Sequence, residues 1–164
     1  MTSAPPTTEK PLSDALPFSD IAAEQALLNA AMWSDDAYDL AARYVNHAAF
    51  YRPAHDQIWA AMAVLRATGA PTGPVAVSDA LRAAGATADT LHILPRIYTQ
   101  PPSLANIAYN ARLVARAAVR RHTYSAAVRA AQATTLADHQ AFRDELTRAI
   151  ERLTALASAW DSAS

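Results

Sequence analysis

The stretch SLANIAYNARLVARAAVRRHTYSAAVRAAQATT, residues 103–135, opens the longest part of the chain that lacks both Gly and Pro. Ser103 is a residue type that caps helix N-termini, and Ala is the strongest helix former. The stretch therefore predicts one long helix. Ala also makes up 42 of all 164 residues, so few large apolar side chains remain for a core. We expect an all-helical oligomer in which a partner chain supplies part of the burial.

A second long helix is predicted from a cap at Asp138 to about Trp160. Along it, apolar residues recur at alternating steps of four and three, a heptad pattern formed by Phe142, Leu146, Ala149, Leu153, Leu156 and Trp160. The connection at 134–137 is short, which favours an antiparallel hairpin. Such a hairpin has more apolar edge than a small globule covers. We predict a partner or dimer interface at Arg129, Leu136, Phe142, Leu146, Leu153 and Leu156.

Five shorter helices are predicted before this hairpin. Their expected ranges are 21–33 after a cap at Ser19 or Asp20, 35–45 after Ser34, 53–68 starting at Pro53 and ended by Gly69, 78–84 after a turn at 72–74, and 91–98. Pro95 should lie in the first turn of the fifth helix or kink it. The predicted fold is all-α: a small globular helical bundle followed by a long antiparallel helical hairpin.

The chain divides into three parts. Residues 1–17 contain Pro5, Pro6, Pro11 and Pro17 among Ser and Thr, which predicts a disordered Pro-rich leader. Residues 18–102 form the globular helical subdomain, and residues 103–164 form the hairpin for dimerisation or partner docking. No apolar run is long enough to span a bilayer, and the charged N-terminal segment is unlike a signal peptide, so we expect a cytoplasmic protein without membrane contact.

Composition excludes several enzyme classes. The 14 basic and 15 acidic residues give a net charge of -1, which argues against a polybasic nucleic-acid binder, and the chain has no Cys for disulfides, thiol catalysis or Cys-based zinc sites. None of the three Gly is followed by Lys, so no phosphate-binding loop of the NTPase type exists. The five His form no metal-binding spacing. We expect no catalytic residue, no cofactor, no metal and no enzymatic activity.

Charge is unevenly distributed over the two long helices. Residues 103–136 contain five basic and no acidic residues, whereas residues 137–164 contain three basic and five acidic residues. The arginines can pair with the acidic last helix, or they can form a face that meets phosphates. The residues for such a nucleic-acid contact would be Arg112, Arg116, Arg120 and Arg121.

Three other groups of residues receive structural interpretations. We expect His55, early in the third helix, to hydrogen-bond the turn at 50–51, and we expect Phe50 and Trp59 to be core residues. The acids at 35, 36 and 39 are interpreted as solvated residues that interact with the positive end of a helix, rather than as a metal or acid–base cluster.

The order of these elements, together with specific strings, resembles the N-terminal domain of the DnaB-type bacterial replicative helicases. The similarity extends from about Phe18 to Trp160. The matching residues are Ala23-Glu24-Gln25 with Leu28; Phe50-Tyr51-Arg52-Pro53-Ala54-His55 with Ile58-Trp59; Gly69-Ala70-Pro71; Leu81 with Gly85; and Pro102-Ser103-Leu104-Ala105-Asn106-Ile107 with Ala111, Val114, Arg120 and Arg121.

The chain departs from the family pattern at a few positions. Asn29 stands where the family usually has Gly, Ala49 where it usually has Asp, and Gly73-Pro74 where an Asp is usual. The linker and RecA-like motor of a full helicase are absent from this sequence. The resemblance implies a non-catalytic domain that pairs through its hairpin, forms a collar of dimers on the motor ring and presents the hairpin to primase.

Three hypotheses of function remain. The chain is a DNA-replication scaffold that docks helicase or primase, a helical dimerisation module unrelated to replication, or a DNA-binding domain that uses the Arg-rich helix 103–135. In each case we expect a homodimer or a higher homo-oligomer. The hairpin tip, residues 134–142 with Arg129 and Leu146, is the surface we expect a partner to contact, unless Leu136 and Phe142 pack within the hairpin itself.

Overall fold

The computed structural model describes residues 18–135 and 139–161. Its described elements are all helical, which confirms the predicted fold class. In chain order they are α1 (Ile21–Trp33), α2 (Asp35–Ala41), the short 3-10 helix η2 (His47–Ala49), α3 (Pro53–Ala67), α4 (Pro74–Ala83), α5 (Ala88–Tyr98), the 3-10 helix η3 (Leu104–Asn106), α6 (Ile107–Thr135) and α7 (His139–Asp161).

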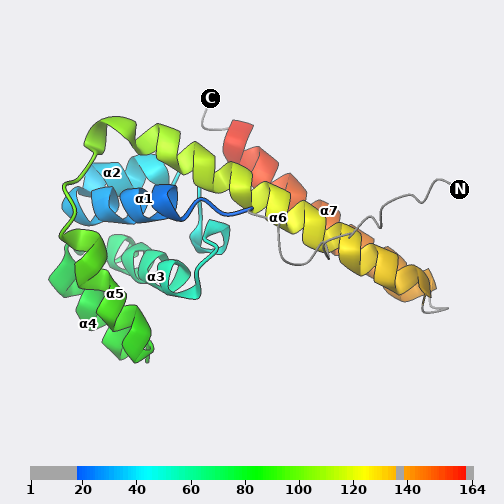
Figure 1. Ribbon diagram of the computed structural model, residues 1–164, viewed down its shortest axis with the longest axis horizontal. Coiled ribbons are helices and arrows are strands. Elements are labelled where there is room, and N and C mark those ends of the chain that lie inside the picture. Colours follow the sequence, from blue (N-terminus) through cyan, green and yellow to red (C-terminus); the bar gives the residue numbers. More distant parts are fainter. Residues whose placement is uncertain (1–17, 136–138, 162–164) are drawn as a thin grey trace, which may run out of the picture.

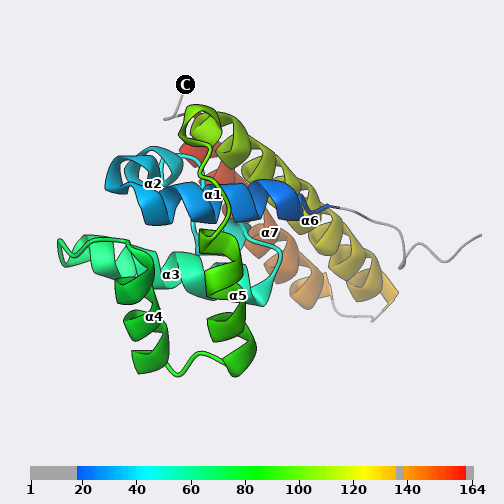
Figure 2. The same ribbon diagram turned by 60° about the vertical axis from the view of Figure 1, so that its left-hand side comes forward.

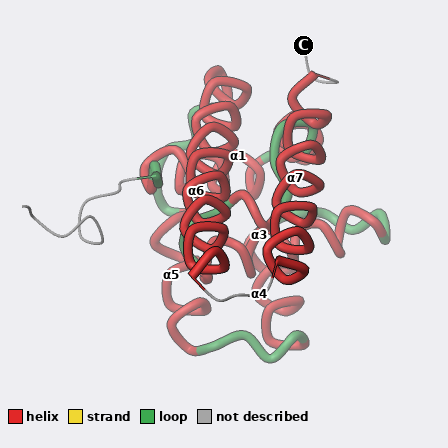
Figure 3. The backbone as a smooth tube through the Cα atoms, turned by 90° about the vertical axis from the view of Figure 1, so that its right-hand side faces the viewer, coloured by secondary structure: helices red, strands yellow, loops and turns green. Residues whose placement is uncertain are grey.

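The molecule has a globule at one end and a two-helix arm at the other (Figure 1). Helices α1 to α5 form the globule, and α6 starts across α1 before it extends beyond the globule (Figures 1 and 2). Helix α7 returns along α6 in the opposite direction, so the two helices lie side by side as an antiparallel hairpin (Figure 3).

The first two helices begin where local capping predicts. The side chain of Asp20 accepts a hydrogen bond of 2.9 Å from the backbone N–H of Ala23, and Ser34 Oγ accepts one of 3.3 Å from that of Ala37. Helix α2 ends at Ala41, four residues earlier than expected. The chain turns there because the backbone N–H groups of both residue 44 and residue 45 bond to the carbonyl of Ala41. Val45 is thereby buried in the core.

Three predicted helix starts were wrong. Helix α4 begins at Pro74, not at residue 78, because Pro is well suited to the first helical position, where its missing N–H has no intrahelical acceptor. Helix α5 begins at residue 88 because Thr87 Oγ1 accepts from the N–H of Thr90 at 3.4 Å, so Pro95 lies inside the helix. Ser103 makes no capping bond to the backbone, and a 3-10 turn precedes α6.

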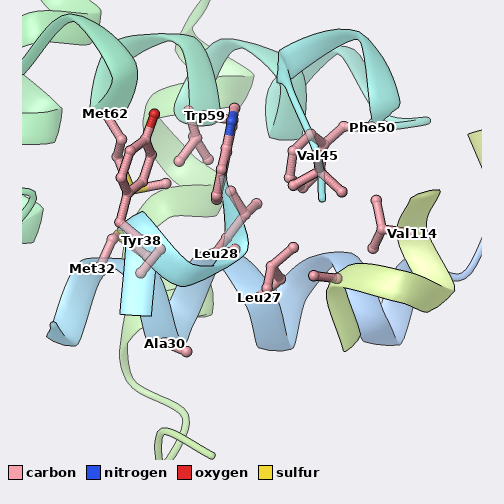
Figure 4. Close-up of a cluster of buried hydrophobic side chains, with 14 of the residues drawn as sticks. Leu27, Leu28, Ala30, Met32, Tyr38, Val45, Phe50, Trp59, Met62 and Val114 are labelled. Carbon is pink, nitrogen blue, oxygen red and sulfur yellow. The ribbon is translucent and has the colours of Figure 1, made fainter. Parts of the chain in front are cut away.

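The core of the globule is built around Trp59 (Figure 4). The rings of Tyr38 and Trp59 stack with centroids 4.6 Å apart, and Phe50 lies 5.3 Å from Trp59 on a tilt. The same buried cluster contains apolar side chains from three helices, namely Leu27, Leu28, Ile58, Met62 and Val114. Phe50 and Trp59 are core residues, as expected.

Alanines bring α6 close to the globule. Ala111, Ala115 and Ala118 of α6 are buried in the same core cluster. Small side chains allow two helix backbones to approach closely, so the Ala-rich composition provides packing of α6 although it provides few large side chains. The first half of α6 is therefore part of the globule, and its second half forms the arm with α7.

Candidate oligomerisation and docking surface

A buried hydrogen-bonded pair lies where α1 meets the start of α3. Glu24 of α1 and His55 of α3 are both fully buried, and their Oε2 and Nδ1 atoms are 2.6 Å apart. The other carboxylate oxygen of Glu24 accepts from the backbone N–H of Tyr51 at 2.7 Å. His55 thus contacts the 50–51 turn through Glu24, not directly as expected. Buried polar groups need such hydrogen-bond partners, so this arrangement holds the turn against α1.

Arg121 of α6 joins the same region and is not on the exposed face of its helix. Its guanidinium donates to the backbone carbonyls of Phe18 and Ala49 at 2.9 Å each, and lies 5.5 Å from the ring centroid of Tyr51. Burial lowers the pKa of Arg121, an effect opposed by the nearby Glu24. Because its hydrogen-bonding groups are used inside the protein, the structure places Arg121 as an anchor of α6 and not with the proposed nucleic-acid contacts.

The other three candidates form an exposed row, here called the arginine row: Arg112, Arg116 and Arg120. Arg112 lies 5.5 Å from the ring centroid of Tyr44, and its Nε donates to the carbonyl of Ala108 at 3.2 Å. None of the three forms an ion pair with another residue in the described part of the chain. Ion pairs with the described acidic side chains of α7 therefore do not occupy this row.

Charge pairing across the hairpin occurs nearer its tip. Arg129 of α6 forms an ion pair with Glu145 of α7, and Arg148 lies 3.8 Å from the same carboxylate. The hydrogen bond from Arg129 lowers the pKa of Glu145. Arg129 was predicted as an interface residue. The structure places its guanidinium against α7 of the same chain, where it links the two helices of the hairpin.

The predicted heptad residues occupy different positions on α7. Ala149 is buried and Phe142 is half-buried, whereas Leu146 is 42 % exposed. Leu136 lies outside the described residues, and so do the side chains of Leu153 and Leu156.

Ile150 was missed by the heptad pattern. It is 55 % exposed and lies one helical turn beyond Leu146, a spacing of four residues that could have identified it. In the described part of the chain α7 packs mainly against α6. The hairpin consequently exposes an apolar pair, Leu146 and Ile150, that its own globule does not cover.

The acids of α2 are not merely solvated, which corrects the sequence interpretation. Arg66 of α3 donates to Asp39 at 2.6 Å and to Asp35 at 3.1 Å. Asp35 also accepts from the backbone N–H of Thr72 at 3.1 Å and from its hydroxyl at 2.9 Å. These hydrogen bonds lower the pKa of Asp35, the one from the Thr72 N–H most of all. Asp36 and Asp39 are both exposed, as expected, and Asp36 forms no ion pair among the described residues.

Two kinds of site are absent from the described residues. No cluster of three or more His, Asp or Glu residues there could hold a metal ion. Among the described helices, none is both long enough and apolar enough to cross a bilayer.

Comparison with known proteins identifies the family. The model of the DnaB-like helicase N-terminal domain matches residues 16–116, which cover the globule and the first part of α6. The chain belongs to this family. The predicted resemblance is therefore confirmed over the globule, where the Phe50–His55 string and the start of α6 lie.

Relatives of this DnaB-like chain include three replicative helicases. It is 35 % identical over 127 residues to the replicative DNA helicase DnaC of Bacillus subtilis, a match that covers 74 % of this chain and 27 % of that protein. It is 33 % identical to the DnaB helicases of Leifsonia xyli and Mycobacterium leprae, covering 71 % of this chain in both cases and 26 % and 20 % of those proteins. The chain thus spans about a quarter or less of the relatives it matches.

A solved structure extends the match to the hairpin. The crystal structure of the N-terminal domain of DnaB helicase from Mycobacterium tuberculosis superposes with a TM-score of 0.74 at 28 % identity, covering 85 % of this chain and 99 % of that one. This share is larger than the globule, so the DnaB-like fold includes part of the α6–α7 arm.

Proposed function

We propose that this DnaB-like domain is a non-catalytic scaffold of DNA replication that oligomerises through its hairpin and docks a replicative helicase or a primase. The observation that carries the proposal is the exposed pair Leu146 and Ile150 on α7, a helix that packs mainly against α6 in the described part of the chain. Burying one such side chain is worth about 1.5–3 kcal/mol. Membership of a family of replicative helicase domains supports the replication context.

The proposed oligomer is a dimer, or a multiple of one, in which α7 of one copy covers α7 of another. Leu146 and Ile150 lie on one face of α7, and the heptad residues Leu153 and Leu156 extend the same helix towards its C-terminal end. Partner proteins would bind at the tip around Phe142, where two rigid helices meet and side chains are accessible. Replication in bacteria takes place in the cytoplasm, where we place this chain.

The oligomer is tested by replacing the apolar pair with charges. The double variant L146D/I150D should sediment as a monomer with unchanged helicity, because both side chains are exposed within one chain. The matched control is V64D/V75D, which alters two valines of the globule that are 63 % and 75 % exposed. The control should sediment like the wild type. An L146D/I150D variant with the mass of the wild type would reject α7 as the interface.

Docking is tested with purified helicase and primase from the source cell. The wild type should retain at least one of them, and F142S combined with L136S should lose it while keeping its helicity and its mass. A melting temperature that falls together with binding would assign both residues to the inside of the hairpin. A wild-type dimer that retains neither protein would favour a dimerisation module unrelated to replication.

A second candidate function is DNA binding through the arginine row. It rests on three exposed arginines at one-turn spacing without an acidic partner among the described residues. The double variant R116Q/R120Q should then weaken DNA binding. The plot of log binding constant against log salt concentration should also become less steep by the slope of about two phosphate contacts, each of which contributes roughly 0.9. DNA affinity that is absent at low salt would exclude this function.

A further inference from the structure

A cavity lies between α1, α5 and the segment that leads from α5 to α6. Its volume is about 550 Å³, within the range of small-molecule sites. Two alanines of α1, Ala22 and Ala26, and two isoleucines of α5, Ile93 and Ile97, give it apolar surfaces. Figures 1 and 2 both show the carboxyl end of α5 meeting α1. The cavity is separate from the hairpin surface described above.

A buried amide with an unused acceptor lines this cavity. Asn29 is only 3 % exposed, and its side-chain NH2 donates to the carbonyls of Ile97 at 3.0 Å and Gln100 at 2.7 Å. Both of its N–H groups are therefore used. They fix the orientation of the amide, because the opposite orientation would place its oxygen against the two carbonyl oxygens. The remaining Oδ1 has no hydrogen-bond partner. A buried acceptor without a donor is costly, so this atom favours a ligand that carries an N–H or O–H group.

Two cations line the same cavity. Arg52, just before α3, and Arg96 of α5 are both exposed, and neither forms an ion pair within the described ranges 18–135 and 139–161. No Asp or Glu occurs among the described lining residues. Guanidinium groups bind phosphate or carboxylate through paired N–H donors. The electrostatics of the cavity thus favour an anion.

We propose that this cavity binds a nucleoside phosphate. The phosphate would pair with Arg52 and Arg96, and the flat base would lie between the small alanines of α1 and the isoleucines of α5. An N–H of the base would donate to Asn29 Oδ1. Every nucleobase has such a donor, so this contact requires a base without selecting one. Inorganic phosphate satisfies the arginines only, and adenosine satisfies the amide only. The proposal extends beyond the scaffold function and does not depend on oligomerisation.

The test titrates the full chain with adenosine monophosphate, adenosine and inorganic phosphate, followed by calorimetry and by backbone amide NMR. The monophosphate should bind at least about tenfold more tightly than either fragment. Its amide shifts should concentrate at residues 22–29 and 93–103. A short single-stranded oligonucleotide with a 5′-phosphate is titrated in parallel. Tighter binding of the oligonucleotide would identify a strand end as the source of the nucleotide, and tighter binding of the monophosphate would identify a free nucleotide.

Variants assign the binding to the cavity. R52Q/R96Q should lower the affinity for the monophosphate at least about tenfold. The melting temperature should stay the same, since neither arginine makes a described ion pair and Arg52 makes no capping bond. The matched control R43Q alters an exposed arginine outside the cavity and should bind like the wild type. N29A removes the acceptor, and its melting temperature is measured because it also removes two hydrogen bonds.

Three results would overturn the proposal. Phosphate that binds as tightly as the monophosphate would reduce the site to an anion patch. An R52Q/R96Q variant with wild-type affinity would place any binding elsewhere. An acidic peptide that shifts the amides of 22–29 while the monophosphate does not would make the cavity a peptide site.

Discussion

At the scale of single residues, a few buried side chains carry much of the stability of an Ala-rich chain. Trp59 contacts both Tyr38 and Phe50, and Glu24 bonds to both His55 and the Tyr51 backbone. Each of these groups joins segments that are far apart in the sequence. With few large apolar residues in the core, the loss of one cannot be offset by its neighbours.

Phe50→Ala should destabilise the protein strongly. Phe50 is buried against Trp59, and truncating a buried aromatic costs about 3–5 kcal/mol in free energy of unfolding. Urea unfolding followed by circular dichroism measures this change. Tyr109→Ala is the control, because Tyr109 is an exposed aromatic of α6 and its removal should cost about 0.5 kcal/mol or less. Similar midpoints for both variants would contradict a core role of Phe50.

His122 should make stability depend on pH. Burial lowers the pKa of this α6 histidine in the folded state below 6.5, an effect partly opposed by a hydrogen bond with the backbone of Ala48. The unfolded chain therefore binds protons first as the pH falls, so the contribution of His122 is complete above about pH 7 and declines below about 6.5. His122→Gln should flatten the curve of unfolding free energy against pH in this window. An unchanged slope between pH 7 and 5 would argue against the shift.

At the scale of elements, polar clamps determine how the helices of the globule meet. The hydroxyl of Thr72, before α4, lies 2.6 Å from the carbonyl of Ala31 in α1 and 2.9 Å from Asp35 in α2. Arg66 of α3 holds the other side of α2 through Asp35 and Asp39. These two groups of hydrogen bonds tie α2 to the ends of α1 and α3. They thereby position Tyr38 of α2 against Trp59.

Thr72→Val should loosen this junction. It removes a buried hydroxyl and leaves the Ala31 carbonyl without that donor, a loss of about 1–3 kcal/mol. The pKa of Asp35 should rise toward its ordinary value but stay below it, because the Thr72 N–H still donates. Chemical denaturation and a carboxyl NMR titration measure the two effects. The control is Thr68→Val at the exposed end of α3, which should leave the pKa of Asp35 unchanged.

At the scale of the whole molecule, the globule and the hairpin have different requirements. The globule contains the core cluster, whereas α7 depends on α6 and leaves Leu146 and Ile150 to solvent. A second copy would cover these side chains and stabilise the arm. Assembly then becomes part of the folding equilibrium, and stability depends on protein concentration.

Thermal unfolding should accordingly shift with concentration. The melting temperature of the wild type should rise when the protein is concentrated about a hundredfold, because binding between copies favours the folded state by mass action. The melting temperature of L146D/I150D should be the same at every protein concentration, and that of V64D/V75D should rise like that of the wild type. Differential scanning calorimetry measures all three proteins. A wild-type melting temperature that is independent of concentration would contradict the proposed dimer.

The local chemistry of the amino-acid sequence was sufficient to predict the fold class and most helix boundaries. The caps Asp20 and Ser34 act within one turn, and Gly69 and Gly85 have φ values of 74° and 71°, which only Gly adopts without strain. The Phe50–His55 string and the Ser103–Ile107 region indicated the family that the comparison confirmed. Such features depend on near neighbours, so they are visible before folding is considered.

Long-range contacts, in contrast, could be identified only from the tertiary structure. Arg121 looked like a member of a cationic helix face, but its guanidinium reaches carbonyls 72 and 103 residues away. Asn29 looked like a departure from a family pattern, but its amide bonds to the end of α5 and lines a cavity with Arg52 and Arg96. Helix periodicity specifies which side of a helix a residue occupies. It does not specify which distant backbone that side meets, because packing of the whole globule determines that partner.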